Sequence, residues 1–136
     1  MLSKINKIAV IGTGVIGTGW IIRMLAHNKK VSAFDLNFKQ KVILIKEIKR
    51  SLPFVKKLYK KKLINLKNLS FKTSLLETLK DVDFIQECAS ENYKLKTKLM
   101  SDIGKYSKPN AIISSSSSGL LPVSYTHLRA HETYKD

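Results

Sequence analysis

A glycine motif near the N-terminus constrains the fold of this 136-residue chain more than any other feature. The segment Gly12-Thr13-Gly14-Val15-Ile16-Gly17 has the pattern G-x-G-x-x-G. It follows a short apolar run, residues 7–11, and precedes apolar residues at helical spacing over 15–28, where Asn28 is predicted to end the helix in a left-handed conformation. Residues 31–35 then have the composition of a second strand. Two short strands joined by one helix predict a crossover between parallel strands.

Strand and helix patterns alternate along the rest of the chain. Apolar residues recur every three or four positions from Val42 to Tyr59, which predicts an amphipathic helix that bends or restarts at Pro53. Strand character returns at 69–73, 83–87 and 111–114. Residues 74–80 predict a short helix capped by Ser74, and residues 93–104 predict a helix that ends at Gly104. The order predicts an α/β fold, a Rossmann-type doubly wound parallel sheet truncated after about five strands.

Each glycine of the motif has its own steric task. Gly12 permits a tight turn, Gly14 lets the backbone approach a diphosphate, and Gly17 lets the helix pack closely on the strand. The start of the helix adds free N–H groups and a partial positive charge. Asp35 follows Gly17 by 18 residues, where a carboxylate accepts hydrogen bonds from the adenosine ribose and repels a 2′-phosphate. The motif and Asp35 therefore predict a site for NAD rather than NADP, although Asp35 alone also suits a helix cap.

The chain is strongly basic, with 25 Lys+Arg against 10 Asp+Glu and a net charge of +15. Twelve basic residues and one acid, Glu47, lie between Lys39 and Lys72. Such a surface attracts phosphates, but a solvated lysine-rich face has the same composition. No RNA-binding aromatic signature or recognition-helix motif accompanies it. A basic nucleic-acid-binding domain is kept as the alternative of a different class, and we expect no nucleic-acid partner.

The composition also bears on location. A single cysteine, Cys88, excludes an internal disulfide framework and favours a reducing compartment. No run approaches the ~20 apolar residues of a membrane span. Residues 1–6 do not resemble a signal peptide. We therefore expect a cytoplasmic protein without a membrane partner.

The last residues, 123–136, lack the periodicity of the rest. Residues 123–133 resemble one reading frame of a sequencing-library adaptor, so we expect a non-native tail. His127 and His131 are for that reason not taken as metal ligands, and no metal site is predicted. The expected organisation is an NAD-binding domain fragment over 1–122 followed by this tail.

Three segments, residues 12–20, 84–96 and 113–122, together resemble the NAD-binding domain of the L-3-hydroxyacyl-CoA dehydrogenase family, in particular its carnitine 3-dehydrogenase and L-gulonate 3-dehydrogenase branch. The resemblance covers the chain up to Pro122. It implies an oxidoreductase that transfers hydride between the 3-hydroxyl carbon of a 3-hydroxy acid or 3-hydroxyacyl-CoA and NAD. It also implies a small-molecule substrate and a homodimeric full-length parent.

The resemblance extends to individual residues. It places Glu91 and Lys96 beside the nicotinamide half of the cofactor, and Cys88 at a small residue whose backbone faces it. Ser116 matches a cofactor-side position, and Ser118 matches the catalytic serine that binds substrate and the catalytic histidine. Solvated charges, a buried thiol and a flexible turn are the alternatives for these positions. The family's histidine base does not lie in these residues, so we expect the fragment to bind NAD without turnover.

The substrate stays open at this stage. The basic stretch supports 3-hydroxybutyryl-CoA or another 3-hydroxyacyl-CoA, because it suits the phosphates of coenzyme A. The motifs at residues 86–91 and 114–122 favour a free hydroxy acid such as carnitine or gulonate, and we give them more weight.

Overall fold

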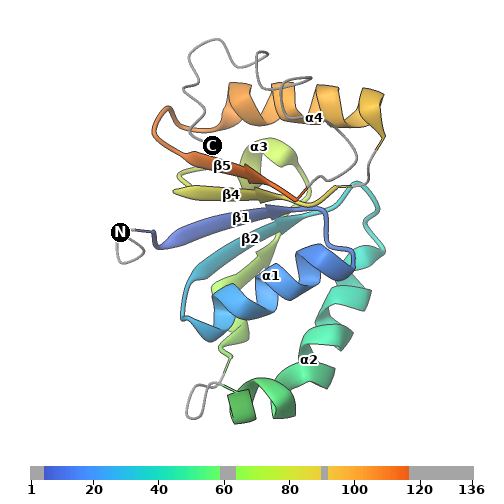
Figure 1. Cartoon of the computed structure of the whole chain (residues 1–136), viewed down its shortest axis with the longest axis vertical. Helices are drawn as coiled ribbons and strands as arrows, with labels where there is room; N and C mark the ends of the chain where they lie inside the picture. The colour runs from blue at the N-terminus through green and yellow to red at the C-terminus, as the bar shows by residue number, and fades with distance from the viewer. Residues whose placement is uncertain (1–4, 59–63, 90–91, 117–136) are drawn as a thin grey trace.

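A computed structural model describes residues 5–58, 64–89 and 92–116, which form a five-stranded parallel sheet between two layers of helices (Figure 1). The strands are β1 (Lys7–Ile11), β2 (Lys30–Phe34), β3 (Leu69–Phe71), β4 (Phe84–Glu87) and β5 (Ile112–Ser115). Their order in the sheet is β3-β2-β1-β4-β5. The predicted α/β fold is confirmed. The order changes direction between β1 and β4, which is where open α/β sheets bind ligands.

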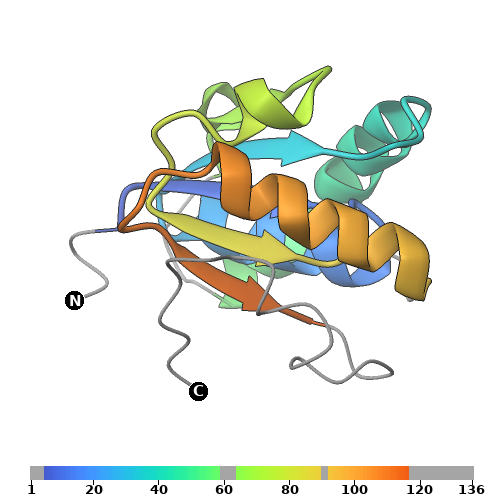
Figure 2. The ribbon, with the colours of Figure 1, turned by 90° about the horizontal axis from the view of Figure 1, so that it is seen from above.

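The helices are divided between the two faces of the sheet (Figure 1). Helices α1 (Val15–Ala26) and α2 (Gln40–Leu58) cover one face, and α3 (Leu75–Thr78) and α4 (Tyr93–Tyr106) cover the other. From above, α4 lies over β4 (Figure 2). A single 3-10 turn, Leu66–Asn68, precedes β3.

Each face of the sheet has its own apolar core, because successive strand residues point to opposite faces. On the α1 and α2 side, the buried residues are Ile8, Val10, Val31 and Ala33 with Ile21, Leu25, Leu44 and Ile48 of the helices. On the α3 and α4 side they are Ala9, Ile11, Ile85 and Ile113 with Leu79, Met100 and Ile103. The two cores fix β1, β2 and β4 side by side, so that their carboxyl ends lie at the same end of the sheet.

Two predictions about helix ends are confirmed. Asn28 has φ of 60°, the left-handed conformation expected of a residue that ends a helix. The Ser74 side chain accepts a hydrogen bond from the Glu77 amide at 3.2 Å and so caps α3. Within the described residues, no helix combines the length and apolar character needed to cross a bilayer, and no cluster of three potential metal-binding side chains occurs.

Other predictions were wrong at helix boundaries and faces. Helix α4 does not end at Gly104 but continues to Tyr106, because buried Ile103 anchors the last turn and the Ser107 amide bonds the Ile103 carbonyl. Of the two alternatives predicted at Pro53, a bend or a restart, the restart does not occur, since Ile48 and Val55 on either side are buried in one continuous helix. Val42, expected on the buried face of α2, is 61% exposed, and Leu44 is buried instead.

Candidate functional site

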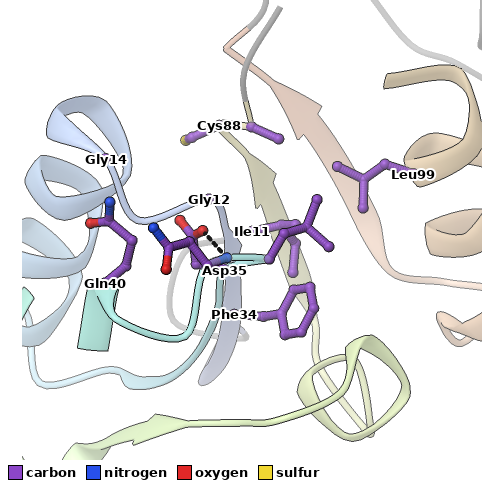
Figure 3. A pocket seen from close by; sticks show the side chains of 11 residues that line it. Ile11, Gly12, Gly14, Phe34, Asp35, Gln40, Cys88 and Leu99 are labelled. Atoms are coloured by element: carbon purple, nitrogen blue, oxygen red, sulfur yellow. Dashed lines mark hydrogen bonds between the residues drawn. The ribbon is translucent and has the colours of Figure 1, made fainter. Parts of the chain in front are cut away.

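A cavity of about 350 Å³ opens at the carboxyl ends of β1, β2 and β4 (Figure 3). Ligand pockets in proteins commonly measure about 300–1,000 Å³. Gln40 of α2 and Leu99 of α4 line the cavity. Three chain segments supply most of the remaining wall, namely the glycine loop after β1, the turn after β2 and the loop after β4. Their lining residues include Gly12, Gly14, Asp35, Asn37, Cys88 and Ala89. The cavity therefore lies at the topological switch point of the sheet.

The three glycines of the loop occupy three different environments. Gly12 has φ of +94°, and a Cβ atom there would lie 2.7 Å from the Ala89 nitrogen. A Cβ on Gly17 would lie 1.8 Å from the Gly12 carbonyl oxygen. A Cβ on Gly14 would meet no atom within 4 Å. Gly12 and Gly17 are thus required by the packing of the chain itself, whereas the space beside Gly14 is open for a ligand.

The N-terminus of α1 begins at this loop without a side-chain cap. Gly14 is the N-cap residue, and no acidic residue lies in the first turn. Val15 and Ile16 in that turn are 92% and 59% exposed. First-turn amides lack acceptors within a helix, so they are available to an anion. The open space beside Gly14 and these amides fit a diphosphate group.

Asp35 joins the turn after β2 to the glycine loop. Its Oδ2 atom accepts hydrogen bonds from the Thr13 backbone amide at 2.8 Å and from Thr13 Oγ1 at 3.2 Å. Its Oδ1 atom accepts one from the Asn37 amide at 2.8 Å. Helix α2 begins only at Gln40, so Asp35 does not cap it. The carboxylate is held at the cavity beside the loop, as Figure 3 shows, and its remaining lone pairs can accept further donors.

Polar side chains at the ends of β4 and β5 meet beside Cys88, which lines the cavity. Ser116 Oγ accepts a hydrogen bond from Gln86 Nε2 at 2.7 Å and lies 3.4 Å from Cys88 Sγ. Burial raises the pKa of the Cys88 thiol. A thiol with a raised pKa stays protonated at neutral pH. Cys88 is therefore a small side chain in the cavity wall rather than a nucleophile. The structure brings Cys88 and Ser116 together.

Lys96 is buried, with only 1% of its surface exposed, so it is not a solvated surface charge. Its Nζ atom donates to Glu87 Oε2 and, at 3.0 Å, to the Ala89 carbonyl oxygen. Glu87 is itself fully buried. Glu87 was not predicted to be a functional residue. The available signal was an acidic side chain at the end of a buried strand, where an unpaired charge is costly.

Some residues of the predicted site and tail lie outside the part of the chain that the structure describes. Glu91 and Ser118 lie outside the described residues, as do His127, His131 and the rest of the predicted tail. Much of the basic stretch lies on the exposed side of α2. Of that helix, only Gln40 lines the cavity.

Comparisons with known proteins agree with this geometry. Residues 7–133 match the family described as "3-hydroxyacyl-CoA dehydrogenase, NAD binding domain". L-carnitine dehydrogenase of Staphylococcus epidermidis is 40% identical over 116 residues, which are 85% of this chain and 36% of that protein. L-carnitine dehydrogenase of Oceanobacillus iheyensis is 41% identical over 117 residues, which are 86% of this chain and 38% of that protein. The chain thus spans less than half the length of these two relatives.

Solved structures show the same fold. The 3-hydroxybutyryl-CoA dehydrogenase of Escherichia coli K12 superposes with a TM-score of 0.77 at 23% identity, over 90% of this chain and 26% of that one. The (S)-3-hydroxybutyryl-CoA dehydrogenase of Ralstonia eutropha gives 0.76 at 24% identity, over 92% of this chain and 47% of that one. The matched range 7–133 includes much of the tail, whose non-native origin stays a prediction. The chain belongs to the NAD-binding domain family of the 3-hydroxyacyl-CoA dehydrogenases.

Proposed function

We propose that this chain binds NAD in the cavity and forms the cofactor half of an enzyme that oxidises or reduces the 3-position of a hydroxy acid. The observation that carries the proposal is the pairing of Asp35 with the glycine loop. Thr13 holds the Asp35 carboxylate beside the uncapped start of α1. A site for the adenosine ribose therefore adjoins a site for the diphosphate.

Different residues of the cavity bind different parts of NAD. The Gly14 side of the loop and the first amides of α1 receive the diphosphate, and Asp35 accepts the ribose hydroxyls. The carboxylate also repels a 2′-phosphate, which favours NAD over NADP. Bound NAD supplies the hydride acceptor of the reaction. Cys88 lines the opposite wall, and Ser116 lies beside its thiol. We place the nicotinamide half of NAD at this wall, and we propose that Glu91 also contacts it.

For the whole enzyme, the reaction we propose is hydride transfer between the 3-hydroxyl carbon of a small 3-hydroxy acid and NAD, with Ser118 contacting the substrate. The names of the two relatives favour a carnitine-type substrate. The 3-hydroxyacyl-CoA alternative is supported by the basic exposed side of α2, which suits phosphates. We further propose that the enzyme is cytoplasmic and homodimeric.

A titration with NADH tests the binding site. The single tryptophan, Trp20, lies in α1, so transfer of its fluorescence to NADH reports binding. We expect saturable binding that weakens by about tenfold or more in Asp35→Ala, because hydrogen bonds to a charged group contribute about 1.5–3 kcal/mol. The preference for NADH over NADPH should also narrow.

The matched control is Asp102→Ala, which makes the same aspartate-to-alanine change in α4, at a position outside the cavity wall. This control should bind NADH like the parent chain. Equal affinity of the Asp35→Ala and parent chains would contradict the proposed site. Salt-sensitive binding of DNA that is indifferent to NADH would instead support the nucleic-acid alternative. With NAD+ and carnitine or 3-hydroxybutyryl-CoA, we expect no formation of NADH by this chain.

A further inference from the structure

We propose that the buried ion pair between Glu87 and Lys96 positions the Ala89 backbone, and through it the cavity wall that faces Gly12. The inference rests on the proposed function, since the positioned wall belongs to the NAD site. It adds to the role that the family resemblance implies for Lys96, because here Lys96 acts through the Ala89 backbone.

The pair binds both backbone polar groups of Ala89. Glu87 Oε2 accepts hydrogen bonds from Lys96 Nζ and from the Ala89 amide, the latter at 2.7 Å. Lys96 Nζ also donates to the Ala89 carbonyl oxygen at 3.0 Å. The other carboxylate oxygen, Glu87 Oε1, accepts from Ser115 Oγ at 2.6 Å. The loop after β4 is therefore tied at one residue to β4, β5 and the first turn of α4.

Ala89 transmits this restraint to the glycine loop. Its amide nitrogen and the Cys88 carbonyl carbon each lie 2.7 Å from the position that a Cβ on Gly12 would occupy. The two loops thus meet at Gly12 with no room for a methyl group. Ala89 and Cys88 line the cavity, whereas neither Glu87 nor Lys96 belongs to its lining. A shift of Ala89 would move this wall directly against or away from Gly12.

Stability alone gives a weak reason for burying this pair. Removing two charges from water costs about as much as their attraction returns, and apolar replacements of buried pairs are often neutral or stabilising. Both side chains of the Glu87–Lys96 pair are fully shielded from solvent. In the other ion pair at β4, between Asp83 and Lys108, the side chains are 27% and 33% exposed. The buried pair is the one that contacts the cavity wall.

The test is a double variant, Glu87→Gln with Lys96→Met, which removes both charges together and keeps the side-chain volumes close to the originals. We expect its urea unfolding midpoint to stay near that of the parent chain. We expect the NADH affinity to fall by about tenfold or more, because the wall of the site is no longer held in place. Cys88, the single thiol and the neighbour of Ala89, should react faster with an alkylating reagent in the absence of NADH.

The matched control is Asp83→Asn with Lys108→Met, a charge pair at the opposite end of β4. Its NADH affinity and its rate of Cys88 alkylation should equal those of the parent. If the parent chain binds no NADH, the proposed function fails. If the parent binds and the folded Glu87 and Lys96 double variant binds equally well, with unchanged Cys88 reactivity, the positioning role is overturned.

A measurement on the unmodified chain covers the case in which the double variant does not fold. The Ala89 amide is bonded to a buried carboxylate, so its hydrogen exchange should be protected without NADH. Protection would support the restraint. Exchange as rapid as that of an exposed loop amide would overturn it.

Discussion

Two of the glycines in the cofactor loop should respond in opposite ways to the same substitution. In Gly17→Ala, the new Cβ would lie 1.8 Å from the Gly12 carbonyl oxygen, and real Cβ contacts are essentially never below 3.0 Å. The loop or α1 must move to open that contact. Forcing extra volume into packed structure costs about 1–3 kcal/mol and occasionally more. Because the obstacle is backbone, we expect about 3 kcal/mol, which lowers the melting temperature by roughly 10 °C.

In Gly14→Ala, the new Cβ has no neighbour within 4 Å, and φ of −71° is accessible to alanine. The loss of a favourable N-cap residue costs only about 1 kcal/mol. The added methyl group instead occupies the space that we assign to the diphosphate. We therefore expect a folded protein whose NADH affinity is at least about tenfold weaker.

Urea unfolding and NADH titration of the two variants and the parent separate these effects. Gly17→Ala should lose about 3 kcal/mol of stability, whereas Gly14→Ala should lose affinity and no more than about 1 kcal/mol of stability. Parent-like NADH binding by Gly14→Ala would refute the placement of the diphosphate. Parent-like stability of Gly17→Ala would refute the close packing of α1 on the loop.

Two further predictions concern stability away from the cavity. A hydrogen bond from Lys108, with others from the Lys7 and Asn6 amides, lowers the pKa of Asp83 from 3.8 to about 2. The contribution of Asp83 to the free energy of unfolding is therefore present above the unfolded pKa and is lost as the pH falls toward 2. We expect this contribution to be about 1 kcal/mol after solvent screening. In urea unfolding measured as a function of pH, Asp83→Asn should reduce the change in stability over that acid range. At Asn28, where φ is 60°, Asn28→Gly should be more stable than Asn28→Ala by about 1 kcal/mol in thermal unfolding. Both variants lose the asparagine side chain, and only alanine is strained in the left-handed conformation. Equal stabilities of the two variants would contradict this reasoning.

Local patterns were sufficient to predict the fold and the packing of the glycine loop. The alternation of short apolar runs with helical spacing predicted all five strands, because burial on both faces of a parallel sheet leaves a readable run of residues. The steric tasks of Gly12 and Gly17 were also predicted, since they belong to one short segment whose turn and helix start are close in sequence. The same holds for Asn28 and Ser74 at helix ends.

Tertiary contacts decided what spacing alone does not specify. Gly104 is compatible with a helix end or a helix interior, and the burial of Ile103 selects the interior. Val42 and Leu44 both fit a periodic pattern, and the packing of α2 against the α1 side of the sheet buries Leu44.

The Glu87–Lys96 pair is the clearest case of a feature that only the folded chain reveals. Its two residues are nine positions apart, and the strand pairing that brings Ser115 beside Glu87 spans 28 positions. Helical and strand periodicities describe which face of an element a residue occupies. They do not describe which charges share one buried site, because that depends on the register of β4 with β5 and on where α4 begins.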